Sequence, residues 1–350
     1  MAGCALLLLA FLGGSARSGA EVIVANGQKV AFLGDSITRI GATPGGYVRL
    51  VEAGLATNGI KIAVIPAGID GHKSNQMLAR LRRDVLDKKP DWMTLSCGVN
   101  DVWKGKWGVP LDQYKTNVSS IVDQCQQARV KVLILTPTLL KEELDNPPNK
   151  TLAGYVDFLR TLSKEKHCPI ADLNTIFQQA IRNHRNFTGK EGRFLTVDGI
   201  HMNPDGNFLM ATGVLTAMGC SPEQIAKAQA AWQRMPVAPP ITATCEVSPG
   251  KNLQVSCPLT LEEFHRFRDS VTPANAQLGD VMNAELSAEI KSLVGPGREF
   301  ANPEAIFQTK KERQVTQVLN ERFGKWVHSH AAGNPTTAAS QGASRPSGTP

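Results

Sequence analysis

The chain has 350 residues, of which 42% are hydrophobic, and its formal net charge is +7 at pH 7. This length and composition suffice for one substantial globular domain with a hydrophobic core and a smaller second region. No run of five or more basic residues occurs, so the sequence offers no nucleic-acid-binding surface. Its mild positive charge would at most favour acidic polymers or surfaces.

The first twenty residues have the layout of a secretory signal peptide. An apolar stretch at residues 5–12 is followed by small residues at 18–20, and this stretch is too short to remain as a membrane-spanning helix. We therefore expect residues 1–20 to be removed near Ala20, leaving a secreted or periplasmic protein without an integral membrane segment. The alternative is a disordered apolar N-terminus or a misplaced start, because no lysine or arginine precedes the apolar stretch.

From residue 29 to about residue 218, short apolar runs alternate with amphipathic stretches, which is typical of strand–helix units around a parallel sheet. The expected strands are 29–34, 60–66, 91–97, 130–136 and 169–173, and the expected helices are 46–57, 73–87, 112–128, 150–166, 174–184 and 204–218. The sequence thus predicts an α/β fold over residues 21–220, with a three-layer, doubly wound, flavodoxin-like parallel sheet. In such sheets ligands bind beyond the carboxyl ends of the strands.

The pattern changes after the predicted sheet domain. Residues 221–328 combine a helix at 221–234, a proline-rich break at 235–240, a hairpin and two or three further helices. We interpret them as an accessory C-terminal region of α+β type. The last residues, 329–350, are mostly Ala, Gly, Ser, Thr and Pro, a composition that predicts a disordered tail.

Six cysteines remain after the predicted cleavage, too few and too dispersed to hold the fold together through disulfides. Cys97 and Cys125 lie in apolar contexts and are expected to be buried thiols. Cys245 and Cys257 flank a turn-like segment and are candidates for a disulfide across a hairpin, whose register the sequence leaves open. No CxxC, HxxxH or HExxH spacing is present, so we expect no metal site.

The first expected strand ends in Gly34-Asp35-Ser36, which places a serine at the edge of the sheet where a helix begins. There its hydroxyl can be exposed and activated as a nucleophile. The alternative is a serine that caps the helix by accepting hydrogen bonds from its first amides.

Two further segments can supply hydrogen-bond donors at the same edge. The loop after the second strand contains Gly71, whose freedom at positive φ lets a backbone N–H approach a bound oxygen. Asn100 follows the third strand, within the Gly-Val-Asn-Asp of residues 98–101, and its amide can donate to the oxyanion of a tetrahedral intermediate. Taken singly, each is equally compatible with an ordinary turn.

The fourth segment is the Asp-Gly-Ile-His of residues 198–201, just before the helix expected from Pro204. On one loop, Asp198 can accept the Nδ1 proton of His201 and leave Nε2 free to deprotonate a serine. Each of the four segments is weak alone. Their combination, with every member where a doubly wound fold has its active site, predicts a serine hydrolase.

These four segments resemble the sequence blocks of the SGNH or GDSL hydrolase superfamily, and the resemblance extends over about residues 29–218. It implies hydrolysis of esters through an acyl-enzyme, with no metal and no organic cofactor. By this resemblance Ser36 is the nucleophile, His201 is the base, and Asp198 orients the histidine.

The resemblance also implies an oxyanion hole, which consists of the backbone amides of Ser36 and Gly71 and the side chain of Asn100. Pro66 departs from the family, whose second block often opens with Asn. This departure concerns the hydrogen bonding of the loop that follows the second strand more than Gly71 itself.

The expected substrate is a small-molecule or polysaccharide ester, above all a short acyl group such as acetyl on a carbohydrate. Trp103 and Trp107 follow the Asn100 segment and can form a lip on which sugar rings stack, with packing of the loop onto the body as the alternative. His72 is a further candidate for substrate binding, with an ordinary surface histidine as its alternative. No long apolar lid that would shelter a fatty chain occurs.

Three other functions remain open at this point. The first is an esterase of lipids or lysophospholipids. The second is a catalytically idle module that binds carbohydrate or nucleotide, although no Gly-x-Gly-x-x-Gly and no phosphate-binding Lys-Ser/Thr follows the glycines of residues 41–46. The third is an interaction domain within residues 241–328.

Overall fold

The computed structural model describes residues 22–189, 192–248 and 251–270, together with 317, 320, 321 and 323–328. The predicted signal peptide and the predicted C-terminal tail lie outside the described residues. None of the helices in the described ranges has the length and hydrophobicity of a membrane span.

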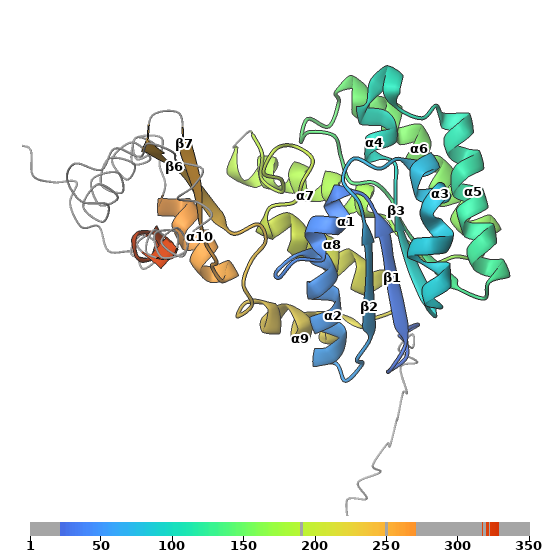
Figure 1. Cartoon of the computed structure of the whole chain (residues 1–350), viewed down its shortest axis with the longest axis horizontal. Coiled ribbons are helices and arrows are strands. Elements are labelled where there is room, and N and C mark those ends of the chain that lie inside the picture. The colour runs from blue at the N-terminus through green and yellow to red at the C-terminus, as the bar shows by residue number, and fades with distance from the viewer. Residues whose placement is uncertain are drawn as a thin grey trace, which may run out of the picture.

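The centre of the molecule is a sheet of five parallel strands in the order β2-β1-β3-β4-β5 (Figure 1). The strands are β1 (Lys29–Gly34), β2 (Ala63–Gly68), β3 (Trp92–Ser96), β4 (Lys131–Leu135) and β5 (Ile170–Ala171). The chain winds outward in both directions from the neighbouring strands β1 and β3, which is the flavodoxin-like topology. The predicted fold class is confirmed.

Helices cover both faces of this sheet and form the two outer layers (Figure 1). On one face lie α3 (Ser74–Asp84), α5 (Leu111–Gln127) and α6 (Pro147–Glu165). On the other lie α2 (Tyr47–Thr57), α7 (Leu173–Thr188), α8 (Pro204–Ala217) and α9 (Pro222–Trp232). Because both faces are covered, the central strands are mostly apolar, and every residue of β3 is buried, including Thr94 and Ser96.

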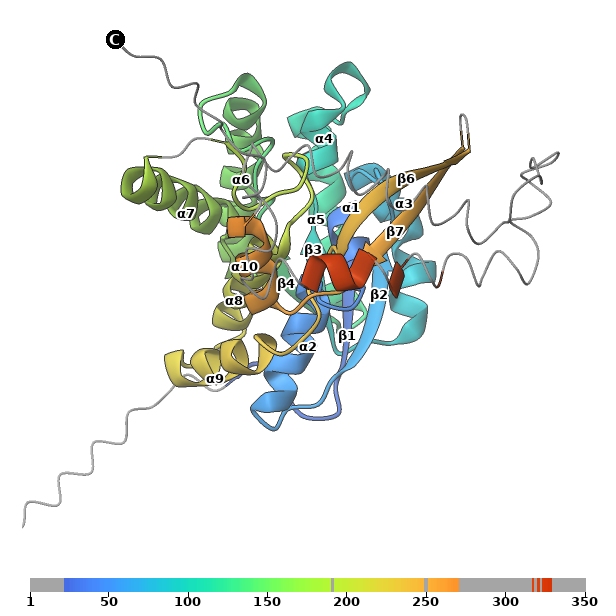
Figure 2. The same cartoon turned by 90° about the vertical axis from the view of Figure 1, so that its left-hand side faces the viewer.

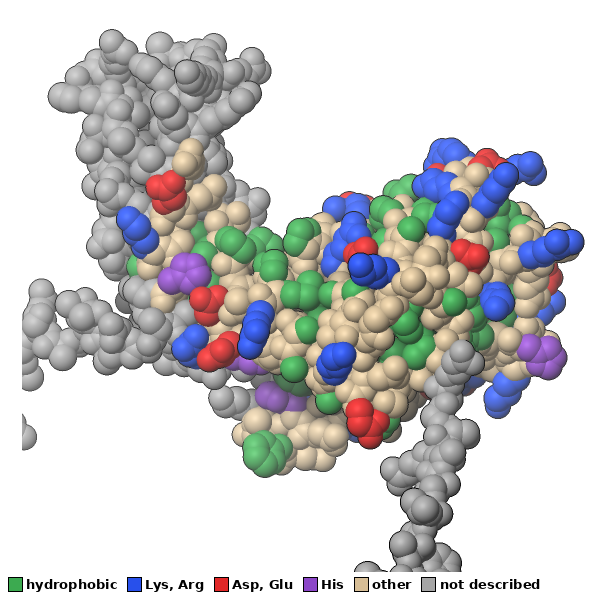
Figure 3. All heavy atoms as spheres, turned by 90° about the horizontal axis from the view of Figure 1, so that it is seen from below, with side chains coloured by type: hydrophobic (Ala, Val, Ile, Leu, Met, Phe, Trp, Pro, Cys, Tyr) green, Lys and Arg blue, Asp and Glu red, His purple; other side chains and the backbone are tan. Residues whose placement is uncertain are grey.

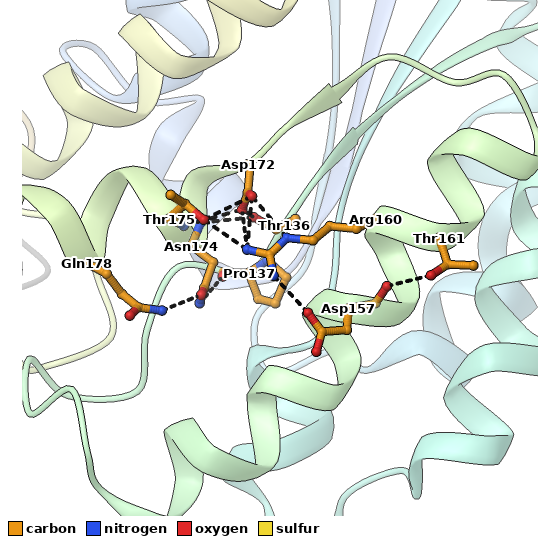
Figure 4. A network of polar contacts seen from close by, with 9 residues as sticks. All are labelled: Thr136, Pro137, Asp157, Arg160, Thr161, Asp172, Asn174, Thr175 and Gln178. Carbon is orange, nitrogen blue, oxygen red and sulfur yellow. Dashed lines mark hydrogen bonds and ion pairs between the residues drawn. The ribbon is translucent and has the colours of Figure 1, made fainter.

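The strand β5 has only two residues, fewer than the predicted 169–173, because Asp172 already serves the next helix. Its carboxylate accepts a hydrogen bond from the backbone N–H of Thr175 at 3.3 Å and so caps α7. The same carboxylate accepts from the guanidinium of Arg160 on α6 and from the hydroxyl of Thr136 (Figure 4). This network ties α6, the end of β4 and the start of α7 together.

Two short helices lie at the carboxyl edge; a helix start was expected at Ser36 without bounds, and the second helix was not predicted. They are α1 (Ser36–Gly41) after β1 and α4 (Val99–Trp103) after β3. Asp35 caps α1 by accepting from the N–H of Ile37 at 2.9 Å, so Ser36 is the first residue of the helix and is free of the capping role considered for it.

The first helix of the predicted accessory region packs against the main domain. The helix α9 belongs to the stretch that we assigned to the accessory region, but its Ala228 and Trp232 are fully buried in the main hydrophobic core. Beyond it, the hairpin of β6 (Ile241–Ser248) and β7 (Lys251–Cys257) and the helix α10 (Leu261–Ser270) lie at one end of the molecule (Figures 1 and 2). His265 Nε2 on α10 bonds Asp205 Oδ1 on α8 at 2.6 Å.

The register of this hairpin excludes the disulfide considered between Cys245 and Cys257. Cys257 pairs with Ile241, and Cys245 pairs with Leu253. The two cysteines are therefore offset by four residues, or about 13 Å along the strands, whereas a disulfide needs Cα atoms within about 7 Å. Cys257 is a free thiol. Cys97 and Cys125 are free and buried, as predicted.

The basic residues are dispersed on the face of the molecule seen from below (Figure 3). On the face seen in Figure 3, lysine and arginine side chains lie scattered with acidic side chains between them. The net positive charge is thus not concentrated in one patch on this face.

Candidate active site

Three side chains that are far apart in the sequence meet at the carboxyl edge of the sheet. Ser36 opens α1, and Asp198 and His201 lie on the loop between α7 and α8. The Oγ of Ser36 is 2.8 Å from Nε2 of His201, although 165 positions separate the two residues. On the other side of the ring, Nδ1 of His201 is 2.6 Å from Oδ2 of Asp198. These distances form a continuous hydrogen-bonded chain.

The loop that carries Asp198 is shaped by this carboxylate. Its Oδ1 accepts from the backbone N–H groups of Ile200 and His201 at 2.9 and 2.8 Å. Gly199, which directly follows Asp198, has a φ of +95°, a value that favours glycine. Burial would raise the pKa of Asp198, but the hydrogen bonds from the amide and ring of His201 and from the amide of Ile200 outweigh it and hold the pKa below its usual value. Asp198 is therefore a carboxylate at neutral pH.

A carboxylate accepts hydrogen bonds only, so the Nδ1 of His201 carries a hydrogen in this arrangement. The neutral ring then presents Nε2 as an acceptor for the hydroxyl hydrogen of Ser36. This is the proton geometry that turns a serine hydroxyl into a nucleophile.

Asn100 and the loop around Gly71 lie beside this chain. Asn100 is 8% exposed, and its Nδ2 donates to Oδ2 of Asp35 at 3.1 Å and to the backbone carbonyl of His72 at 3.3 Å. Gly71 has a φ of +67°, a conformation that side-chain-bearing residues rarely adopt. The predicted oxyanion donors therefore come from neighbouring segments, and Asn100 directly contacts the residue that follows Gly71.

This constellation coincides with a known sequence family. The model of the GDSL-like lipases and acylhydrolases matches residues 32–208, which include every side chain described above. The chain belongs to the GDSL-like lipase/acylhydrolase family. The predicted resemblance is confirmed.

Several acetylxylan esterases are similar to this GDSL-like protein. One from Geobacillus stearothermophilus is 25% identical over 219 residues, which are 56% of this chain and 96% of the relative. The crystal structure of Axe2, an acetylxylan esterase from Geobacillus stearothermophilus, matches with a TM-score of 0.51 at 25% identity over 57% of this chain and 97% of the other. The crystal structure of the acetyl xylan esterase AlAXEase matches with a TM-score of 0.51 at 33% identity, over 54% of this chain and 98% of the other. With the family match, these relatives identify a carboxylic ester hydrolase.

Asp35 of this GDSL-like hydrolase links two parts of the site. It is 2% exposed, and its carboxylate accepts from Ile37 at the start of the Ser36 helix and from the side chain of Asn100. Burial raises the pKa of Asp35 to about 6, against the opposing effects of the Ile37 amide and the charge of His201. Sequence reasoning quoted Asp35 as part of a motif but assigned it no role.

Arg80 is a second residue that sequence reasoning missed. Its guanidinium is buried and donates to the backbone carbonyls of Gly34 at 2.8 Å and Ala67 at 2.9 Å, at the ends of β1 and β2. It also donates to Nδ1 of His72 at 3.1 Å. Burial first, and then the charge of Arg80, lower the pKa of His72. Arg80 thus holds the ring of His72, and the backbone carbonyl of His72 accepts from the side chain of Asn100.

The two tryptophans predicted to line the site are exposed: Trp103 is the last residue of α4, and Trp107 lies four residues beyond it. Trp103 lies one helical turn after Asn100 and is 43% exposed, and Trp107 is 71% exposed. The ammonium of Lys106 lies over the Trp107 ring, 5.3 Å from its centroid. The Nζ of Lys73, two residues after Gly71, donates to the Trp107 carbonyl at 2.5 Å. The segment that carries Trp107 is thus attached to the loop that contains Gly71.

A hollow of about 480 Å³ adjoins the triad on the side of Asp198. Its lining residues are Lys141, Glu142, Glu143, Arg185, Gly192, Arg193, Asp198 and Gly199. In the part of the chain that the structure describes, no group of three or more His, Cys, Asp or Glu side chains is arranged to hold a metal ion.

Proposed function

We propose that this ester hydrolase removes short acyl groups, acetyl above all, from carbohydrate through an acyl-enzyme on Ser36. The observation that carries the substrate class is the similarity to acetylxylan esterases along at least 96% of their length. The hydrogen-bonded chain of Asp198, His201 and Ser36 supports the mechanism. The enzyme would act outside the cytoplasm, as the N-terminal segment predicts.

In the first half of the reaction, Oγ of Ser36 attacks the ester carbonyl carbon while Nε2 of His201 accepts the hydroxyl proton. The electron pair of the carbonyl bond moves to its oxygen, and the resulting oxyanion is stabilised by hydrogen-bond donors. The intermediate then expels the sugar oxygen, which takes the proton from His201 and leaves as an alcohol. The acyl group stays on Ser36.

In the second half, a water molecule repeats the attack on the acyl-serine. His201 accepts one proton from the water, and the new intermediate expels Oγ of Ser36, which recovers that proton. The products are the free carboxylic acid and the unmodified enzyme. Asp198 stabilises the imidazolium during both halves without itself taking a proton.

The oxyanion donors assigned here are the amides of Ser36 and Gly71 and the side chain of Asn100. Both hydrogens of the Asn100 amide already have acceptors, at 3.1 Å in Asp35 and at 3.3 Å in the carbonyl of His72. Binding of an oxyanion must therefore replace one of these bonds. We assign the exchange to the bond with His72, because it is the longer and weaker of the two.

The exposed rings of Trp103 and Trp107 suit the sugar part of the substrate. Aromatic faces pack against the apolar faces of pyranose rings, and Trp107 is the more exposed of the two. The hydrogen bond from Lys73 to the Trp107 carbonyl joins this segment to the loop that contains Gly71, and would hold a sugar close to the reacting ester.

The test is a comparison of kcat/KM across p-nitrophenyl esters of increasing acyl length and across acetylated and deacetylated xylooligosaccharides, with Ser36→Ala as the control. We expect acetyl esters to be the best substrates, acetate to be released from the oligosaccharides, and Ser36→Ala to be inactive but folded. A rise in kcat/KM with acyl length, without acetate release from sugars, would identify a lipid esterase instead. Normal turnover by Ser36→Ala would exclude the acyl-enzyme on that residue.

A further inference from the structure

The loop that carries Asp198 and His201 needs an anchor outside itself. Its internal bonds, such as Val197 N–H to the His201 carbonyl at 2.9 Å and Asn203 N–H to the Leu195 carbonyl at 3.0 Å, shape it as a small hairpin. These bonds fix its shape but not its position relative to Ser36, which lies on a different element. The distance of 2.8 Å between Ser36 and His201 depends on what holds the loop to the sheet.

Glu142, seven residues after β4, holds this loop through three hydrogen bonds. Glu142 is buried, with only 3% of its surface exposed. One carboxylate oxygen accepts from the N–H of Phe194 at 2.7 Å, and the other accepts from the N–H of Leu195 at 2.9 Å and from the hydroxyl of Thr196 at 2.6 Å. All three donors belong to consecutive residues that lead into Asp198.

The contact continues through Thr196 to the residue beside Asp198. The hydroxyl of Thr196 donates to Glu142 and accepts from the N–H of Gly199 at 3.1 Å. The carbonyl of Gly199 in turn accepts from the N–H of Lys141, the neighbour of Glu142, at 2.6 Å. The carbonyl of Gly199 is thus bonded directly to the segment that contains Glu142, and its N–H is linked to Glu142 through the hydroxyl of Thr196.

We propose that Glu142 is a positioning residue, which keeps Asp198 and His201 in line with Ser36 by holding their loop to the segment after β4. This inference rests on the proposed roles of those three residues. A glutamine at position 142 keeps one acceptor oxygen and turns an NH₂ group toward backbone N–H groups, so at least one buried donor loses its partner. A triad displaced by about 1 Å loses about a hundredfold in rate.

The experiment compares Glu142→Gln with Glu143→Gln, a matched control. Glu143 is the next residue and also lines the hollow beside Asp198, but it is exposed and its carboxylate takes no part in the bonds described above. We expect Glu142→Gln to lower kcat on p-nitrophenyl acetate by about a hundredfold with KM nearly unchanged, at a temperature where the variant is folded. Glu143→Gln should match the wild type.

A second variant, Thr196→Val, removes only the hydroxyl and keeps both backbone bonds to Glu142, so it is informative even if Glu142→Gln does not fold. We expect a loss of kcat of roughly tenfold, because the N–H of Gly199 loses its acceptor and Glu142 loses one of its three donors. A folded Glu142→Gln or Thr196→Val enzyme with unchanged kcat would reduce the contact to a structural one and overturn the proposal. A rise in KM alone would also overturn it, since it would indicate substrate binding.

A further readout separates this proposal from the proposed function. Because Nδ1 of His201 is 2.6 Å from Asp198, we expect the hydrogen between them to give a proton NMR signal far downfield of the amides, whether or not any substrate is turned over. We expect this signal to shift or broaden in Glu142→Gln and to stay in place in Glu143→Gln. An inactive wild-type enzyme would contradict the proposed function, and an unchanged downfield signal in Glu142→Gln would contradict the positioning role.

Discussion

Replacement of Asp198 with Asn reverses the direction of one hydrogen bond while leaving the loop around it intact. The Asn oxygen can keep both backbone bonds that Oδ1 now accepts from Ile200 and His201. Its NH₂ group then takes the place of Oδ2, 2.6 Å from Nδ1 of His201, and donates where the carboxylate accepted. The ring is forced to carry its hydrogen on Nε2, which can no longer accept the proton of Ser36.

The expected loss in kcat is about 10⁴-fold, or about 5.5 kcal/mol of transition-state stabilisation. Stability should change little, by less than about 1 kcal/mol, because the Asp198 side chain is 50% exposed and its backbone bonds survive. The signature of the variant is therefore a large kinetic loss in a folded protein with a nearly normal melting temperature.

Asp101→Asn is the matched control with the opposite signature. Asp101 is buried and its Oδ1 accepts from the N–H and the hydroxyl of Ser74, at 3.0 and 2.6 Å. Its replacement should lower the free energy of unfolding by about 1–3 kcal/mol, since buried donors lose a charged partner. We expect kcat to stay within about tenfold, because no described hydrogen bond joins Asp101 to Ser36 or His201.

The assay measures kcat on p-nitrophenyl acetate and the urea-unfolding free energy for both variants, over a range of pH. Asp198 does not orient His201 if Asp198→Asn keeps its rate within tenfold of the wild type while Asp101→Asn loses it. In that case the carboxylate that acts on His201 must come from elsewhere in the chain.

Three more predictions concern the same site. Asn100→Ala should lower kcat by about a hundredfold or more with a smaller change in KM, as loss of an oxyanion donor does; a rise in KM alone would make Asn100 a substrate-binding residue. The value of kcat/KM should rise with pH on the acid side because a general base must accept the proton of Ser36, and a flat profile would argue against general-base catalysis. Burial raises the pKa of Asp35 to about 6, so the folded protein holds this proton more tightly than the unfolded chain does. Protonated Asp35 therefore stabilises the fold in acid, and this contribution is lost as pH rises through about 6. The unfolding free energy of Asp35→Asn, measured relative to the wild type, should therefore increase by about 2 kcal/mol between about pH 4 and about pH 7, and a constant difference would contradict the assigned pKa.

The parts of the fold that were predictable are those whose signal is local. The strand β1 was expected at 29–34 and is found at Lys29–Gly34, because a continuous apolar run between turn residues is visible in the sequence. The strand β2 lies at Ala63–Gly68 and was expected at 60–66. Its ends are decided by pairing with β1, from Lys29 opposite Ala63 to Gly34 opposite Gly68. The short helices α1 and α4 contain six and five residues, too few to show a helical period.

The register of the β6–β7 hairpin could not be predicted from the sequence either. The turn between Cys245 and Cys257 is visible in the sequence, and the hairpin exists. Which residues face each other depends on how the strands pair, and this pairing offsets the two cysteines by four positions. A sequence that places two cysteines near a turn therefore does not determine whether they can be bridged.

The sequence by itself determined the chemical groups of the candidate site, because each comes with its own local marker: Ser36 after a strand, Asn100 after another, and Asp198 three residues before His201. Only the tertiary structure decided how these groups are held. Arg80 joins the ends of β1 and β2 from a helix, and Glu142 reaches residues 52 to 54 positions further along the chain. A buried arginine or glutamate has no local signature, since what it does depends on which distant backbone groups need a partner after the chain has folded.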